Sequence, residues 1–303
     1  DQVRSSEVAD NRMGAAMGWM MIAKLAQWNH RWDDALEALG ELEKIYGDLQ
    51  QYPLEDIMFR NKNTPESIFE VQRTYTAGGL AVTTNVAAIC TPSHNGKGIY
   101  DGVEIPEMGT GMTTWTSMRP NSYFCDGLQT KKGNDKRKTL NMAWEYDGKP
   151  FSNVGTRPWL GPKFWCPGMQ NTADFNNQKI FRYADAVLMM SECYAEQENI
   201  DESIRYLNMV KERAGLAPYT FKNIESLMEE IQKERGRELL GEFQRKFDLV
   251  RWGIWYQMTY DYTNYSTLKE NMLPCHEYYP IPDKEVVYSG GALDNKAYNE
   301  YGM

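Results

Sequence analysis

The sequence lacks an apolar run long enough to cross a bilayer. Its longest uninterrupted apolar stretch, "AAMGWMMIA", covers residues 15–23, whereas a membrane-spanning helix needs about twenty such residues. It is also short of positive charge, with a formal net charge of −9, and no helix-length segment carries a long basic stripe. Phosphate backbones would therefore be repelled, which argues against a nucleic-acid partner. The one basic cluster, "KKGNDKRK" at 131–138, is typical of a solvated turn.

Residue patterns for metal, cofactor or nucleophilic chemistry are equally scarce. The three histidines form no H-E-x-x-H motif, and the five cysteines are scattered, without a C-x-x-C pair. The segment "DFNNQ" from Asp174 is similar to a calcium loop, but Lys179 occupies the position that requires glycine. Glycine-rich phosphate loops and G-x-S-x-G are missing as well. We therefore expect no metal, no cofactor and no disulfide framework.

Two helix pairs are predicted from the hydrophobic periodicity. The first covers 15–29 and 33–47, with Asp33 as the expected N-cap and Gly47 as the expected C-cap. The second covers 181–197 and 201–216. The segments "WDDALEALGEL" (32–42) and "IDESIRYLNMV" (200–210) share an apolar residue, two acids and matched apolar positions. Such an internal repeat is typical of tetratricopeptide-like helix pairs. A third helical block is expected over roughly 223–260.

The region between the helix pairs has a different composition. "SIFEVQRTY" (67–75) predicts a strand, and residues 76–180 are rich in Gly, Pro, Asn, Thr and aromatics with little periodicity. Irregular segments of this length are usually functional or disordered, and the aromatic content argues against disorder. The predicted fold is therefore all-α, with tetratricopeptide-like helix pairs and a long loop-rich, aromatic-rich insertion that carries the site.

The stretch "IQKERGRELLGEFQRKFDLVRWG" (231–253) alternates acids and bases along what we expect to be one helix. It carries six bases and four acids, whereas the helix that follows Arg182 is mostly acidic. The two helices are thus charge-complementary, and each has an apolar stripe that must pack. We expect them to face one another with partly buried Arg–carboxylate pairs, which favours a structural over a catalytic role for these charges.

The aromatic residues are the strongest sign of a binding site. Nine Trp, nineteen Tyr and ten Phe are more than a core of this size usually needs. A flat ring stacks on the C–H face of a sugar, while neighbouring amide and guanidinium groups bind its hydroxyls. The alternative is that the rings only pack the loops onto the helices. The candidate ligand-binding residues are Tyr75, Tyr100, Trp115, Arg119, Asn121, Tyr123 and Trp159.

Three ordered motifs resemble the SusD/RagB family, which consists of surface nutrient-binding lipoproteins of Bacteroidetes. They are "FRYADAVLMMSECYAE", the stretch at 231–253 with its E-R-x-x-E-L…E…R…D-L-x-R-W-G pattern, and "YYPIPDKEV". "NDKRK" is also similar to a short D-x-R segment of the family. The C-terminal "LDNKAYNEYGM" departs from the family's Q-N-P-G-Y. We expect a single SusD-like domain that lacks its N-terminal portion, with parts at 1–75, 76–180 and 181–303.

The resemblance implies binding without catalysis. The expected ligand is an oligosaccharide, captured at the bacterial cell surface and passed to a SusC-like TonB-dependent transporter in the outer membrane. A lipid anchor would lie in the missing N-terminal portion. Two alternatives stay open: a peptide- or protein-binding helical-repeat module, and an all-helical glycoside hydrolase with a pair of catalytic acids, although no pair stands out among forty-two acids.

Overall fold

The computed structural model describes residues 13–94, 96–152 and 157–302. The chain divides into two compact units, one up to Arg245 and one from Lys246 onward, and each is considered by itself. Within the described ranges, no helix combines the length and the apolarity that a membrane span requires.

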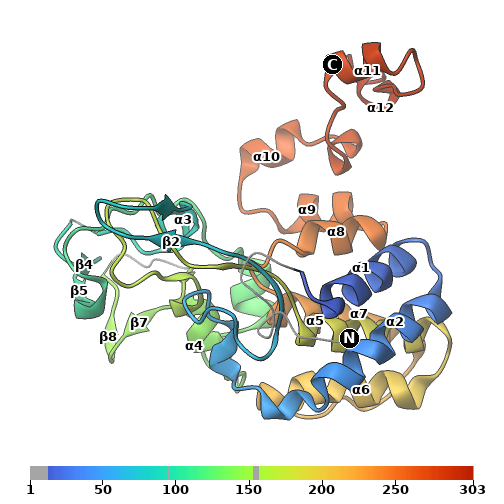
Figure 1. Ribbon diagram of the computed structural model, residues 1–303, viewed down its shortest axis with the longest axis horizontal. Helices are drawn as coiled ribbons and strands as arrows, with labels where there is room; N and C mark the ends of the chain where they lie inside the picture. The colour runs from blue at the N-terminus through green and yellow to red at the C-terminus, as the bar shows by residue number, and fades with distance from the viewer. Residues whose placement is uncertain (1–12, 95, 153–156, 303) are drawn as a thin grey trace. The chain divides into compact units, whose positions relative to one another are not determined.

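The first unit is built on the two predicted helix pairs (Figure 1). The helices are α1 (Ala15–Trp28), α2 (Trp32–Tyr46), α5 (Tyr183–Glu196), α6 (Ile200–Arg213) and α7 (Ile224–Glu238). Gly47 ends α2 with a φ of 67°, so the predicted C-cap is confirmed. The predicted N-cap is wrong: α2 begins at Trp32, and Asp33 lies in its first turn, where a negative charge still favours the helix dipole.

One hydrophobic core joins these five helices. Small buried residues such as Ala35 and Ala184 let the helices approach closely, and most of α5 is enclosed on all sides. The rings of Tyr46 and Tyr183 stack with centroids 5.0 Å apart. Their hydroxyls donate hydrogen bonds to the carbonyls of Ser67 and Gly47, respectively. The buried tyrosines thus satisfy their polar groups while they tie the two helix pairs together.

We expected the charged stretch at 231–253 to form one helix, but this prediction is wrong. It is divided because α7 ends at Glu238 and α8 (Arg245–Arg251) begins after a turn in which Gly241 and Phe243 have φ of 71° and 64°. Positive φ values cannot continue a right-handed helix.

The predicted facing is confirmed for α5 and the part of this stretch up to Glu242. An Arg235 guanidinium nitrogen lies 2.9 Å from a carboxylate oxygen of Asp185. Arg182, which directly precedes α5, contacts carboxylates of both Glu238 and Glu242 at 2.8 Å. All five side chains are buried, so these pairs are a structural element of the interior rather than surface ions.

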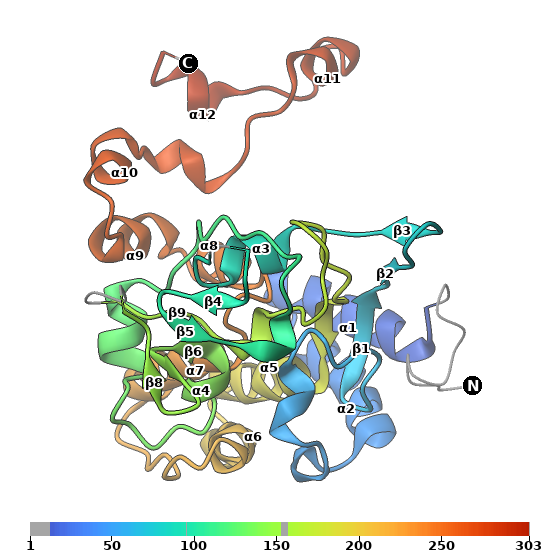
Figure 2. The same cartoon turned by 90° about the vertical axis from the view of Figure 1, so that its left-hand side faces the viewer.

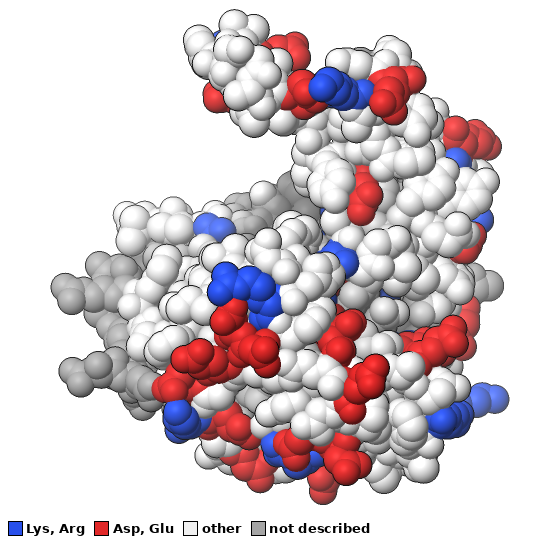
Figure 3. All heavy atoms as spheres, turned by 90° about the vertical axis from the view of Figure 1, so that its right-hand side faces the viewer, with Lys and Arg blue, Asp and Glu red and all other residues white. Residues whose placement is uncertain are grey.

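The basic cluster at 131–138 is a solvated turn only in part: Lys131, Lys132 and Lys136 are exposed, as predicted, but two residues of the cluster are buried. Arg137 has no exposed side-chain surface, and Asp135 is also buried. The Arg137 guanidinium lies 2.7 Å from carboxylate oxygens of Asp135, Glu234 and Glu238. Composition could not indicate this, because the acids that neutralise Arg137 come mainly from α7, about a hundred positions later. Figure 3 shows where other acidic side chains gather on one face of the surface.

The loop-rich part of the first unit is held by short antiparallel strand pairs. β1 and β10 lie at the two ends of this loop-rich part, and their pairing brings those ends together. The predicted strand at 67–75 is confirmed as β1 and β2. The pairs are β1 (Ser67–Val71) with β10 (Gln178–Arg182), β2 (Thr74–Tyr75) with β3 (Ala81–Val82), β4 (Ile99–Tyr100) with β5 (Val103–Glu104), β6 (Met142–Ala143) with β9 (Trp159–Leu160), and β7 (Glu145–Tyr146) with β8 (Lys149–Pro150).

A second hydrophobic core lies beneath these hairpins. It contains Tyr100, Trp159 and Trp165 together with valine, isoleucine and methionine side chains. The short helix α3 (Val86–Cys90) contributes Ala87 and Ala88 to this core, and the short helix α4 (Lys138–Asn141) directly precedes β6. Figure 1 shows β4, β5, β7 and β8 grouped on the left of the first unit, and in Figure 2 β4, β5 and β8 again lie on one side of it.

The second unit consists of short helices with few buried side chains. After α8 come α9 (Trp255–Tyr262), α10 (Ser266–Asn271), α11 (Asp283–Tyr288) and α12 (Lys296–Asn299), and none of these four has a buried residue. The P-I-P segment is held by Asn295. Its side chain accepts from the Ile281 N–H at 2.9 Å and donates to the Ile281 carbonyl at 2.8 Å.

Candidate functional site

An extended segment at 113–118 runs along α3 and is fixed to it by its backbone. The Trp115 and Thr116 N–H groups donate to the Ala88 carbonyl at 2.8 and 3.2 Å, and the Met118 N–H donates to Ile89 at 3.1 Å. These bonds use carbonyls that the short helix leaves unsatisfied at its C-terminal end. The segment is therefore held in register without being part of a sheet.

Side-chain hydrogen bonds hold the same segment from below. The Thr114 hydroxyl donates to the Pro92 carbonyl at 3.0 Å, and the Thr116 hydroxyl donates to the Thr91 carbonyl at 3.1 Å. Trp115, which lies between these two threonines, faces outward and remains 51% exposed, and Met118 at the end of the segment is equally exposed. A large ring that is exposed on a fixed backbone loses little conformational entropy when a ligand covers it.

Arg119 and Trp159, which are forty residues apart in the sequence, lie together in the structure. The Arg119 guanidinium carbon lies 4.2 Å from the Trp159 ring centre, in cation–π geometry. The same guanidinium donates to the carbonyls of Pro158 and Arg157. Trp159 is 8% exposed, and its buried indole Nε1 has no hydrogen-bond partner among the described residues. Arg119 thus stacks on a ring that is otherwise packed in the core, and it is itself held in place.

Asn121 and Tyr123 lie at the beginning of the next turn. The Asn121 side-chain oxygen accepts from the Phe124 N–H at 3.0 Å. Tyr123 begins a π-helical turn (Tyr123–Leu128), and both side chains are partly exposed. π-Helical turns are rare and often occur at functional sites. Together with Trp115 and Arg119, these residues form a continuous stretch of chain, which we call the 115–123 face.

The other two predicted residues lie elsewhere. Tyr75 is partly exposed on β2, and its ring is nearly parallel to that of Phe175 at a centroid distance of 6.3 Å. Tyr100 is fully buried, 4.6 Å from the His94 ring centre, with its hydroxyl directed at the Met112 sulfur. Burial raises the pKa of Tyr100 well above its usual value. Its ring packs the core under β4 and β5.

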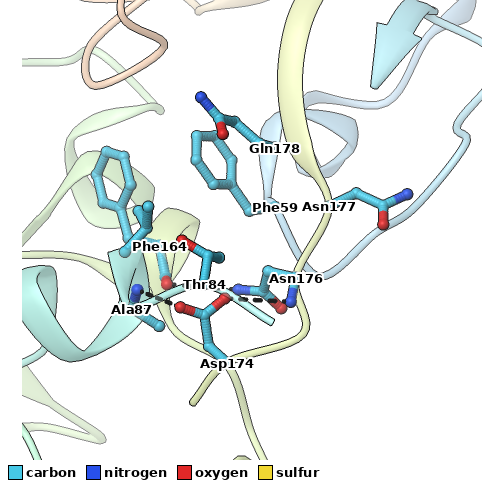
Figure 4. A pocket seen from close by; sticks show the side chains of 9 residues that line it. Phe59, Thr84, Ala87, Phe164, Asp174, Asn176, Asn177 and Gln178 are labelled. Carbon is cyan, nitrogen blue, oxygen red and sulfur yellow. Dashed lines mark hydrogen bonds between the residues drawn. The ribbon is translucent and has the colours of Figure 1, made fainter. Parts of the chain in front are cut away.

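A group of hydrogen bonds around the Asp174 carboxylate lies beside α3 and is shown in Figure 4. Asp174 accepts from the Ala87 N–H at 2.9 Å and from the Asn176 N–H at 3.3 Å. Burial raises the pKa of Asp174 despite these donors. The space between Phe59 and Phe164 has no volume that a water-sized molecule could enter, so it is far smaller than the usual ligand site. These hydrogen bonds fix α3 to the chain at 174–176 and thereby support the 115–123 face.

Sequence reasoning missed two contributors to this region. Met118 is exposed three positions after Trp115, and alternation would have placed it on the underside with Thr114 and Thr116. Phe175 backs Tyr75 from a hundred positions further along, and no local pattern indicates that contact.

The described ranges of the chain contain no arrangement of side chains suited to metal binding or thiol chemistry. No three His, Cys, Asp or Glu side chains in those ranges lie close enough together to hold a metal ion. All five cysteines are free and buried. Burial raises the pKa of Cys90 to about 12, so its reactive thiolate form is suppressed at neutral pH.

Sequence comparison finds one matching family and a curated relative. Residues 163–298 match the sequence model of the SusD family. The SusD-like protein P25 of Formosa agariphila is 34% identical over 175 residues, which is 55% of this chain and 32% of that protein. The chain therefore spans about a third of the length of this relative.

Solved structures with the same fold cover almost the whole chain. A SusD superfamily protein from Bacteroides vulgatus has a TM-score of 0.65 at 25% identity, over 92% of this chain and 61% of its own. The surface glycan-binding protein A of Bacteroides thetaiotaomicron, solved in complex with laminarihexaose, has a TM-score of 0.69 at 19% identity, over 97% and 66%. The predicted all-α, tetratricopeptide-like fold is thus confirmed, and the chain spans less than two thirds of these structures.

Proposed function

We propose that this chain is a member of the SusD family, whose sequence model matches residues 163–298, and that it binds oligosaccharides at the bacterial cell surface without catalysing a reaction on them. We further propose that it delivers them to a SusC-like TonB-dependent transporter in the outer membrane, where a lipid anchor would hold the complete protein. The relative solved with laminarihexaose supports a glycan as the ligand class.

The observation that carries the proposal is Trp115, a half-exposed indole on a segment hydrogen-bonded to α3. A flat apolar ring matches the C–H face of a pyranose, and a fixed backbone keeps the ring ready for stacking. The partly exposed Arg119 and Asn121 follow within six positions and supply polar groups for hydroxyls.

The remaining predicted residues take different parts in this proposal. Tyr123 would extend the contact surface, and the buried Trp159 would support Arg119 from beneath. Tyr75, paired with Phe175, would meet a different part of a long glycan. Tyr100 would act only by shaping the core, because its ring has no exposed surface.

Tryptophan fluorescence during titration with a panel of oligosaccharides tests the proposal. The loss of a central stacking ring costs about 1.4 kcal/mol or more, so Trp115→Ala should weaken binding at least about tenfold. Trp28→Ala is the matched control, because Trp28 is similarly exposed on α1, and it should leave affinity unchanged.

Three results would contradict the binding proposal. If no oligosaccharide binds while peptides bind tightly, the helical-repeat module is the better account. If reducing ends accumulate on long incubation and removal of one acid abolishes them, the protein is a hydrolase. Unchanged affinity in Trp115→Ala would remove the 115–123 face from the binding site.

Delivery to a transporter needs a separate test. The complete protein should co-purify from outer membranes with a SusC-like transporter. Recovery of the complete, glycan-binding protein without any such partner would contradict delivery while leaving glycan binding intact.

A further inference from the structure

A surface groove of about 580 Å³ lies between the hairpins β4–β5 and β7–β8, apart from the residues assigned above. It is lined by Glu104, Pro106, Glu107, Tyr146, Asp147 and Lys149. A volume of this size lies within the range of small-molecule sites. The lining comes from two segments about forty positions apart, so the groove exists only in the folded chain.

The walls of the groove are fixed by two matching turns. Asp101–Gly102 and Asp147–Gly148 each have positive φ at both positions, between 45° and 84°. Two-residue turns of this kind fit the twist of the flanking strands and hold a hairpin tightly. The Ser152 N–H, just after β8, donates to the Asp101 carbonyl at 2.6 Å and links the two hairpins.

Tyr146 supplies a ring whose position is set from two sides. Its ring centre lies 5.8 Å from that of the buried Trp165. Its hydroxyl donates to a carboxylate oxygen of Glu107 on the other wall. On β5 and the residue after it, Val103 and Ile105 are buried, whereas Glu104 is exposed. The groove therefore combines a fixed aromatic ring with outward-directed carboxylates.

The charges of the lining select a class of ligand. Three carboxylates and one lysine give the groove a negative balance, which repels uronate and sulfate groups. Carboxylate oxygens accept hydrogen bonds from hydroxyls, and these bonds are stronger than neutral ones. The carboxylates do not converge as metal ligands, since the described ranges contain no such group of three.

We propose that this groove is a second saccharide-binding site, selective for uncharged over acidic glycans. The proposal rests on the proposed glycan-binding function and adds to it the ligand class and a second point of contact. Two sites on one loop-rich region would raise the apparent affinity for a long glycan through effective concentration.

Hydrogen exchange of the whole chain separates this proposal from the proposed function. The probes are four uncharged hexasaccharides (laminari-, cello-, manno- and xylohexaose), hexagalacturonate as the acidic probe, and a chitosan hexamer as the cationic probe. An uncharged hexasaccharide should slow exchange at 103–107 and 145–150 as well as at 113–123. Protection at 113–123 alone would overturn the groove but keep the proposed function, and protection at neither would overturn both. Equal or stronger groove protection by either charged hexamer would show that the ligand class is wrong.

A double variant on exposed positions tests the groove without disturbing the core. Glu104→Lys with Asp147→Asn reverses one charge and removes another, and asparagine tolerates the positive φ at 147. Protection of 103–107 and 145–150 should require an at least tenfold higher concentration of the uncharged glycan, while protection of 113–123 persists. Glu37→Lys, an exposed charge reversal on α2, is the matched control and should change neither. If the double variant retains full groove protection, the proposal fails.

Discussion

Replacement of Arg182 by alanine should destabilise the first unit more than any surface charge deletion. The Arg182 guanidinium lies 2.7 Å from a carboxylate oxygen of Glu66, and 2.8 Å from oxygens of both Glu238 and Glu242. All four side chains are at most 1% exposed. Arg182 thus joins the end of β10 to the chain just before β1 and to the end of α7.

The magnitude follows from what the deletion leaves behind. Arg213 still contacts Glu66 at 3.0 Å and Glu238 at 2.6 Å, and Lys163 still contacts Glu242 at 2.7 Å. No carboxylate is therefore left without a base, but the buried cluster has one positive charge too few. Breaking a buried ion pair typically costs about 3–5 kcal/mol, and we expect Arg182→Ala to lower the free energy of unfolding by about that amount.

Arg31→Ala is the matched control. Arg31 forms an ion pair with Asp34, but the two side chains are 68% and 43% exposed. Water and salt screen such a pair, so its deletion should cost only about 0.2–1 kcal/mol. Urea unfolding followed by circular dichroism measures both variants. If Arg182→Ala and Arg31→Ala lose the same small amount, the buried cluster does not stabilise the fold and our reasoning is wrong.

Two further predictions concern the same unit. Burial opposes ionisation of Glu66 and Glu238, but the guanidinium groups around them outweigh it and hold the pKa of each below its usual value near 4.5. In that acid range the unfolded chain binds more protons than the folded chain. The free energy of unfolding, measured with urea, should therefore be highest above about pH 4.5 and should fall as the pH is lowered below it. A free energy of unfolding that stays constant down to pH 3 would contradict this. Gly161→Ala should cost about 1–3 kcal/mol in the same assay, because an added Cβ would lie 2.5 Å from the Leu140 carbonyl oxygen and 2.7 Å from the Met142 nitrogen. Its control is Gly18→Ala on α1, where the added methyl meets nothing within 4 Å and should stabilise slightly; equal effects of the two substitutions would refute the crowding at Gly161.

The helix pairs could be predicted from the sequence because their signals are local. Periodic apolar residues and the glycine at position 47 mark elements whose stability depends on neighbours three and four positions away. The break between α7 and α8 was missed, because Phe243 adopts a positive φ that its residue type does not favour. Only the surrounding tertiary contacts determine that conformation.

The candidate site was predictable only in part. The clustering of aromatic and polar residues at 115–123 was visible in the sequence. The burial of Tyr100 and Trp159 was not, because both pack in a core assembled from strands far apart in the chain. The groove beside Tyr146 was also not visible, since its two walls meet only after the hairpins form.

A crystal structure of the chain with the oligosaccharide that binds it best tests the central claim most directly. Our account predicts a sugar ring stacked on the indole of Trp115, with hydroxyls within hydrogen-bond distance of Arg119 or Asn121. A glycan bound elsewhere on the chain, with Trp115 still open to solvent, would contradict it.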